Sequence, residues 1–128
     1  MTVHNALVGT GLRDQVKLGA SGKVAGGADI VMRMIQGADF TNAARAMMMA
    51  LGCIQAQRCH TGKCPSGVAT QDPRRTRAVV VEEKSRAVYN FQKATVQQAV
   101  RLMASMGVSD PAELNPAMLR RNVSPTEA

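Results

Sequence analysis

The three cysteines of this chain lie close together, at Cys53, Cys59 and Cys64, with five and then four residues between them. Their segment is polar and runs directly into Pro65 and a nearby glycine, as is typical of a loop. Cysteines that only fill a core rarely crowd into so short a loop. Three thiolates match a three-iron cluster, in which each iron takes one cysteine. The sequence therefore predicts a 3Fe-4S centre bound by these cysteines.

Two other interpretations of the cysteine segment stay open. His60 could complete a zinc site of three cysteines and one histidine, although structural zinc usually takes ligands in closely spaced pairs. The cysteines could also be thiols that bind no metal. Because their number is odd, a secreted disulfide scaffold is disfavoured.

The elements that must position these groups alternate between helix and strand. Apolar spacing and turn residues predict helix 4–16, strand 16–20, helix 28–36, strand 37–41 and helix 43–51, then the cysteine loop 53–73 and a long helix 76–106. Strand, crossover helix and strand form a βαβ unit, whose strands run parallel. Since two parallel strands make no stable sheet alone, the first half of the chain is expected to pair with further strands.

Particular residues predict where the helices begin and end. Asn42 is expected to cap the helix that follows it, and Gly107 is expected to end the long helix. Asp110 begins a capping box with Pro at the first helical position, and Asn115 opens another short turn. The tail from Asn122 is polar and expected to fray.

One face of the long helix carries a stripe with steps of three and four residues, which predicts a packing face. The stripe consists of Val81, Lys84, Val88, Phe91, Thr95, Ala99, Leu102 and Met106. Tyr89 and Asn90 fall outside it.

Two turns after the expected strands could bind a phosphate. Ser21, Gly22 and Lys23 follow the first strand, and Ala44 and Arg45 follow the second. Glycine lets the backbone approach a phosphate, amides at a helix start attract it, and Arg45 adds a cation. Phosphate sites in TIM barrels recur in the loops after the last two strands. The pair of turns therefore predicts a phosphate site, without a Walker motif or a dinucleotide fingerprint.

The composition limits the function classes. The net charge of +7 would suit nucleic acid, but aromatic residues make up only 2% and the arginines are spread out, apart from Arg74, Arg75 and Arg77. Nucleic-acid binding is therefore not expected. No apolar run could span a bilayer and no leader is recognisable, so a cytoplasmic protein without membrane contact is expected.

The glycine turns and the cysteine loop together resemble the glutamate synthase family. Residues 4–73 look like the end of its FMN-binding domain, and residues 74–122 resemble the helical tail of its stand-alone members. The segment ALGCIQAQRCHTGKCPSGVATQD carries most of this specificity. The resemblance implies an α/β fold, the last two units of a (β/α)8 TIM barrel, followed by the cysteine loop and C-terminal helices.

The same resemblance implies the cofactors FMN and 3Fe-4S. Cys53, Cys59 and Cys64 would hold the cluster. The FMN phosphate would bind to the two turns, at Ser21, Gly22, Lys23, Ala44 and Arg45. Gln55 and Gln57 would either orient the cluster or flavin or serve the loop structure alone.

The reaction implied is the formation of L-glutamate from 2-oxoglutarate and ammonia, free or derived from glutamine, by reduction of 2-iminoglutarate. Ferredoxin or an NAD(P)H-dependent partner would supply the electrons. No general acid or base is evident, since His4 is expected on the surface or in packing and His60 lies in the cluster loop.

The expected division is a partial barrel over 1–73 with the iron–sulfur loop 53–64, a helical extension over 74–122 and a tail over 123–128. Because a TIM barrel needs about 250 residues, the chain is expected to be a fragment, a truncated frame or one part of a split enzyme, and inactive when isolated. The alternatives are a non-catalytic zinc or iron–sulfur interaction module, a degenerate fragment, and the same fold acting on N-methylglutamate.

Overall fold

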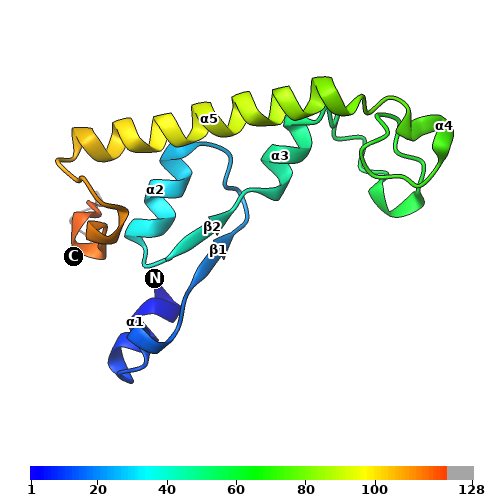
Figure 1. Cartoon of the computed structure of the whole chain (residues 1–128). Coiled ribbons are helices and arrows are strands. Elements are labelled where there is room, and N and C mark those ends of the chain that lie inside the picture. Colours follow the sequence, from blue (N-terminus) through cyan, green and yellow to red (C-terminus); the bar gives the residue numbers. More distant parts are fainter. Residues whose placement is uncertain (121–128) are drawn as a thin grey trace, which may run out of the picture.

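The computed structural model describes residues 1–120. Its principal elements are helix α1 (Thr2–Gly9), strand β1 (Gly19–Ser21), helix α2 (Gly27–Ile35), strand β2 (Phe40–Asn42), helix α3 (Ala44–Ala50), helix α4 (Pro73–Thr76) and helix α5 (Val81–Ser105). Short 3-10 turns occur at Arg13–Gln15, Cys59–Thr61, Pro111–Glu113 and Pro116–Met118. In Figure 1, α5 forms a long bar with α2 and α3 against one side, and the cysteine segment lies at the end near α4.

The βαβ unit is confirmed. β1 and β2 pair in parallel, with Ala20 opposite Thr41. The end residues of both strands are exposed, and the Phe40 side chain is 50% exposed although it is a large apolar ring. Within residues 1–120 these two strands form the whole sheet. The sheet is therefore left largely uncovered.

The core lies where α2 crosses α5. Val31 and Ile35 of α2 pack with Ala99 and Met103 of α5, and the cluster also includes Val108 and Leu114 from the C-terminal segment. Val31 is 1% exposed and is the most deeply buried large side chain in the described region. Burial of these aliphatic groups holds the βαβ unit against the long helix.

The predicted helix 4–16 is too long. α1 ends at Gly9, and Gly11 takes a left-handed φ of +69° that a helix does not continue through. The following turn holds Arg13, whose guanidinium donates to His4 Nδ1 at 3.1 Å and to the Asp39 carboxylate at 2.9 Å. His4 is therefore a packing histidine, as expected.

Both strands begin later than predicted, at Gly19 and Phe40. β1 begins late because the Asp39 side chain accepts a hydrogen bond from the Leu18 amide at 2.7 Å and takes that amide away from strand pairing. β2 begins late because the amides of Gly37 and Ala38 still donate to carbonyl oxygens at the end of α2. The Leu18 amide and the Arg13 guanidinium also hold the pKa of the Asp39 carboxyl below its ordinary value.

The predicted cap at Asn42 is wrong. Asn42 pairs with Ser21 as the last residue of β2, and α3 has Ala43 as its N-cap, without a side-chain cap among the described residues. The strand therefore continues into the position where the sequence pattern suggested a cap.

The long helix also begins later than predicted. Asp72 caps the separate helix α4 by accepting from the Arg74 amide at 2.9 Å, and α5 starts only at Val81. Thr95 and Ala99 of the predicted stripe are buried, but Val81 is 78% exposed and Met106 is also exposed. The stripe is correct at its centre and wrong at both ends.

The C-terminal turns are largely as predicted. Gly107 follows α5 with a φ of +74°. The Asp110 carboxylate accepts from the Ala112 amide at 2.8 Å while the Glu113 carboxylate accepts from the Asp110 amide at 2.8 Å, which forms the capping box. Asn115 caps the next turn. The predicted fraying from Asn122 lies outside the described residues.

The crossing of α2 and α5 depends on Gly27. A β-carbon there would collide with the Ala99 amide and would lie 2.6 Å from the Thr95 carbonyl oxygen. Because these are backbone atoms, we expect Gly27→Ala to lower the free energy of unfolding by about 1–3 kcal/mol. Urea denaturation measures this loss.

Gly26→Ala is the matched control. Among the described residues, a β-carbon at Gly26 would meet only the Gln98 side chain, whose Oε1 atom would lie at 3.0 Å. This side chain is flexible, and its movement would disturb no more than its hydrogen bond from the Gly27 amide. Equal losses at the two glycines would contradict the packing explanation.

Candidate functional site

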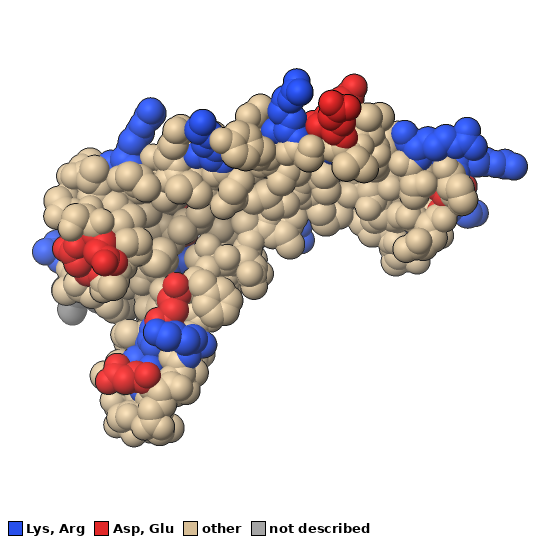
Figure 2. Space-filling model, in the orientation of Figure 1, with Lys and Arg blue, Asp and Glu red and all other residues tan. Residues whose placement is uncertain are grey.

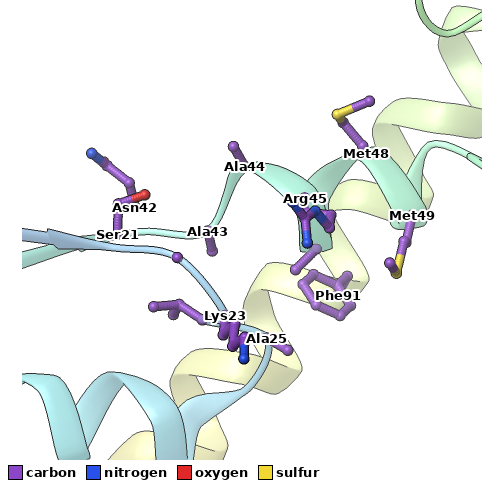
Figure 3. A pocket seen from close by; sticks show the side chains of 13 residues that line it. Ser21, Lys23, Ala25, Asn42, Ala43, Ala44, Arg45, Met48, Met49 and Phe91 are labelled. Atoms are coloured by element: carbon purple, nitrogen blue, oxygen red, sulfur yellow. The ribbon is translucent and has the colours of Figure 1, made fainter. Parts of the chain in front are cut away.

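The two predicted phosphate turns meet at one cavity. Its volume is about 460 Å³. The lining includes Ser21, Gly22, Lys23, Ala44 and Arg45. In Figure 3, Lys23 lies on the turn that leaves β1, and Arg45 lies across from it on α3. The turns come together because the carboxyl ends of neighbouring parallel strands share one edge of the sheet.

The turn after β1 presents open space to the cavity. Gly22 has a φ of +89°, and a β-carbon there would have nothing within 4 Å among the described residues. Lys23 is also left-handed, with a φ of 55°. A side chain at position 22 would therefore occupy space that a ligand group could use.

Asp29 anchors this turn from within α2. Its carboxylate accepts hydrogen bonds from the amides of Ala25 and Gly26, both at 3.0 Å. These two bonds lower the pKa of the Asp29 carboxyl. Asp29 was absent from the sequence predictions, although its place three residues after Gly26 is the spacing of a capping box.

The cavity also has an apolar wall, which lies beside Arg45 (Figure 3). Met48 and Met49 of α3 and Phe91 of α5 form this wall. Sequence reasoning missed Phe91 as a lining residue because α5 is far from the two turns along the chain. Two cations, a glycine and an apolar wall suit a ligand with an anionic group attached to an apolar body.

The cysteine segment follows α3 directly. The Cys53 amide donates to the Met48 carbonyl oxygen at 3.0 Å, so Cys53 is bonded to a residue of the cavity wall. The Gln55 amide lies 3.4 Å from Cys53 Sγ, and the Gln55 side-chain amide lies 3.8 Å from Met49 Sδ. The cavity and the cysteine segment are therefore adjacent.

The three cysteines differ in exposure. Cys59 is exposed, Cys53 is intermediate, and Cys64 is buried. In the described part of the chain, no three His, Cys, Asp or Glu side chains gather closely enough to hold a metal ion. The ligand set of a cluster thus stays a prediction.

Cys64 already has the surroundings of a thiolate. The Ser66 hydroxyl lies 3.4 Å from Cys64 Sγ. This hydroxyl, helped by the Ala69 amide, lowers the pKa of the Cys64 thiol from 9.0 to about 7. Thiolate is the form of cysteine that binds metals, so the donor chemistry fits an iron–sulfur cluster.

We therefore expect one thiol of the metal-free chain to ionise early. Because its pKa is lowered, Cys64 should be half thiolate near pH 7 and mostly thiolate above that pH. Ultraviolet absorbance of the thiolate, followed against pH, measures this step. The Cys64→Ser variant should lose it, whereas persistence of the same step in that variant would contradict the assignment.

Gln55 and Gln57 both have left-handed backbones, with φ of 56° and 54°. These conformations turn the chain sharply between Cys53 and Cys59. The backbone at both glutamines therefore shapes the loop, and the contact of Gln55 with Met49 adds a connection to the cavity.

The surface charge is dispersed. Figure 2 shows Lys and Arg separated along the face that α5 presents, with a further group at the α4 end. No helix within residues 1–120 has the length and apolar character needed to cross a membrane.

Known proteins resemble most of this chain. The family model described as the conserved region in glutamate synthase matches residues 1–109. The glutamate synthase large subunit-like protein YerD of Bacillus subtilis is 45% identical over 101 residues, which cover 79% of this chain and 19% of that protein. The ferredoxin-dependent glutamate synthase of Pyropia yezoensis is 41% identical over 106 residues, 82% of this chain and 7% of that protein.

An archaeal glutamate synthase (NADPH) of Methanocaldococcus jannaschii is 35% identical over 99 residues, 77% of this chain and 19% of that protein. The chain thus spans a fifth or less of the length of these relatives. The family match covers both cavity turns and the complete cysteine segment. The chain belongs to the glutamate synthase family.

Proposed function

We propose that this chain supplies the FMN-phosphate site and the iron–sulfur site of a glutamate synthase-type oxidoreductase. Cys53, Cys59 and Cys64 hold a 3Fe-4S cluster. The FMN phosphate binds in the cavity beside Lys23 and Arg45, together with Ser21, Gly22 and Ala44. When bound, FMN accepts an electron pair and passes electrons singly, and the cluster relays single electrons.

The observation that carries this proposal is the adjacency of the cavity and the cysteine segment. The hydrogen bond from the Cys53 amide to Met48 places the first cysteine at the end of the helix that lines the cavity. The chain thus keeps the sites for an anionic cofactor and a thiolate-bound cluster close together. An electron relay needs its two redox groups near each other.

The cavity offers a suitable environment for a phosphate. Lys23 and Arg45 supply positive charge from opposite sides, and Gly22 leaves room for close approach. Arg45 offers several N–H donors in a planar fork, which matches phosphate oxygens. The apolar wall of Met48, Met49 and Phe91 would contact the less polar part of the cofactor.

The exposure of the two-stranded sheet supports the proposal that it is part of a larger barrel. Two short parallel strands with exposed end residues, and an exposed Phe40, call for neighbouring strands and covering helices. We propose that β1 and β2 are the last two strands of a (β/α)8 barrel and that the remaining strands complete the flavin pocket. Phosphate binding at the ends of such strands is a recurrent feature of that fold.

The reaction we propose is formation of L-glutamate by reduction of 2-iminoglutarate, which arises from 2-oxoglutarate and ammonia. The electron donor is ferredoxin or an NADPH-dependent partner, as the names of the relatives indicate for those proteins. The residues of this chain hold and orient the redox groups, and the substrate contacts belong to the remainder of the barrel.

Comparison of FMN with riboflavin tests the cavity assignment, because the two flavins differ only in the phosphate. In a complete barrel that contains this chain, we expect FMN to bind at least about tenfold more tightly than riboflavin, a difference of about 1.4 kcal/mol. Flavin fluorescence measures both affinities. Equal affinities for FMN and riboflavin would contradict phosphate binding by the two turns.

A further inference from the structure

Ser66 is a candidate for a role toward the cluster that the cysteine pattern does not reveal. Its hydroxyl oxygen lies 3.4 Å from Cys64 Sγ, and the Ser66 residue is partly buried. Cys64 is the most buried of the three cysteines, with 6% exposure. Water therefore competes little for this sulfur, and the Ser66 hydroxyl is within hydrogen-bond distance of it.

The backbone around Ser66 is held in place from two sides. The Gly67 amide donates to the Cys64 carbonyl oxygen at 3.4 Å, which closes a turn around Ser66. Gly67 is also pressed against α4, since a β-carbon there would collide with the Arg75 carbonyl oxygen. These contacts fix the backbone position from which the Ser66 hydroxyl reaches Cys64 Sγ.

The direction of this hydrogen bond follows from the state of the sulfur. An iron-bound cysteine is a thiolate and has no proton to donate, so the hydroxyl of Ser66 must be the donor. Hydrogen bonds to cluster sulfur atoms are one of the means by which proteins set reduction potentials. Added negative charge on the reduced cluster strengthens such a bond, so the bond favours reduction.

We propose that Ser66 is a positioning residue that raises the reduction potential of the 3Fe-4S cluster by donating its hydroxyl hydrogen to Cys64 Sγ. This inference rests on the proposed function, because it requires the cluster to be bound by Cys64. It adds a residue outside the ligand set and gives the direction in which that residue changes the reduction potential.

The test is a redox titration of the anaerobically reconstituted 128-residue chain, followed by electron paramagnetic resonance. At the potential where the unaltered chain is half reduced, Ser66→Ala should raise the ratio of oxidised to reduced cluster roughly threefold to tenfold, about the size of one ordinary hydrogen bond. Ser66→Thr keeps the hydroxyl and should restore the original potential.

Thr61→Val is the matched control. It removes a hydroxyl from the same loop, but the Thr61 hydroxyl donates to the Arg58 carbonyl oxygen at 2.8 Å and serves the backbone. Its potential should match that of the unaltered chain. A change equal to that of Ser66→Ala would show a general loop effect and overturn the inference.

The remaining outcomes separate the two proposals. A cluster whose potential is the same in Ser66→Ala and in the unaltered chain would overturn the role of Ser66 and leave the proposed function standing. An unaltered chain that assembles no three-iron cluster would overturn both. A potential that moves upward in Ser66→Ala would also contradict the inference, because loss of a donor must disfavour reduction.

Discussion

The Cys59→Ser variant should lose the visible absorbance of the cluster completely while its helix content stays unchanged. Each iron of a three-iron cluster needs one thiolate, so a missing ligand prevents assembly and does not merely weaken it. Cys59 is exposed and lies in a short 3-10 turn, so serine at this position disturbs little of the fold. Visible absorbance after anaerobic reconstitution and far-ultraviolet circular dichroism measure the two quantities.

His60→Ala provides the matched control for this prediction. His60 is exposed and adjoins Cys59, and it would be the fourth ligand of a zinc site. If the three cysteines alone bind the cluster, His60→Ala should keep the full absorbance. Survival of the absorbance in Cys59→Ser would refute the ligand assignment, and loss of metal in both variants would favour the zinc site of three cysteines and one histidine.

The second large effect is expected at Gly22. In a complete barrel, replacement by valine should weaken FMN binding about tenfold or more, because Gly22 lines the cavity and a β-branched side chain there would crowd the turn and be strained at a φ of +89°. Riboflavin affinity should fall less, since riboflavin has no phosphate to bring to the turn. Flavin fluorescence titration measures both changes.

Gly11→Val separates crowding of the cavity from backbone strain. Gly11 has a similar φ of +69°, and a β-carbon there would likewise have nothing within 4 Å among the described residues, but it lies outside the cavity lining. This variant should carry a similar strain and bind FMN as the unaltered chain does. Equal weakening by the two valines would show that strain alone is responsible.

The alternation of strand and helix was enough to predict the βαβ unit, the parallel pairing and the centre of the stripe on α5. The pattern could not give the start of β1, because the side chain of Asp39 removes the Leu18 amide from strand pairing. The pattern also predicted the wrong role for Asn42, since a residue that resembles a helix cap can also end a strand. Local propensity does not contain these side-chain contacts.

The candidate site, like the fold, could be predicted from the sequence only in part. That the two turns share a cavity follows from parallel strand order, and the five predicted phosphate residues do line one cavity. Their role toward FMN stays a prediction. Phe91 and Ser66 could not be found from local patterns, because their importance comes from the path of α5 and from a turn that closes on Cys64.

Electron paramagnetic resonance of the oxidised, anaerobically reconstituted chain, with iron and labile sulfide determined on the same sample, tests the proposed cluster most directly. We expect a three-iron signal, with iron and sulfide in the proportions of a 3Fe-4S cluster. Zinc in place of iron, or thiols that bind no metal under these conditions, would contradict the proposed cluster.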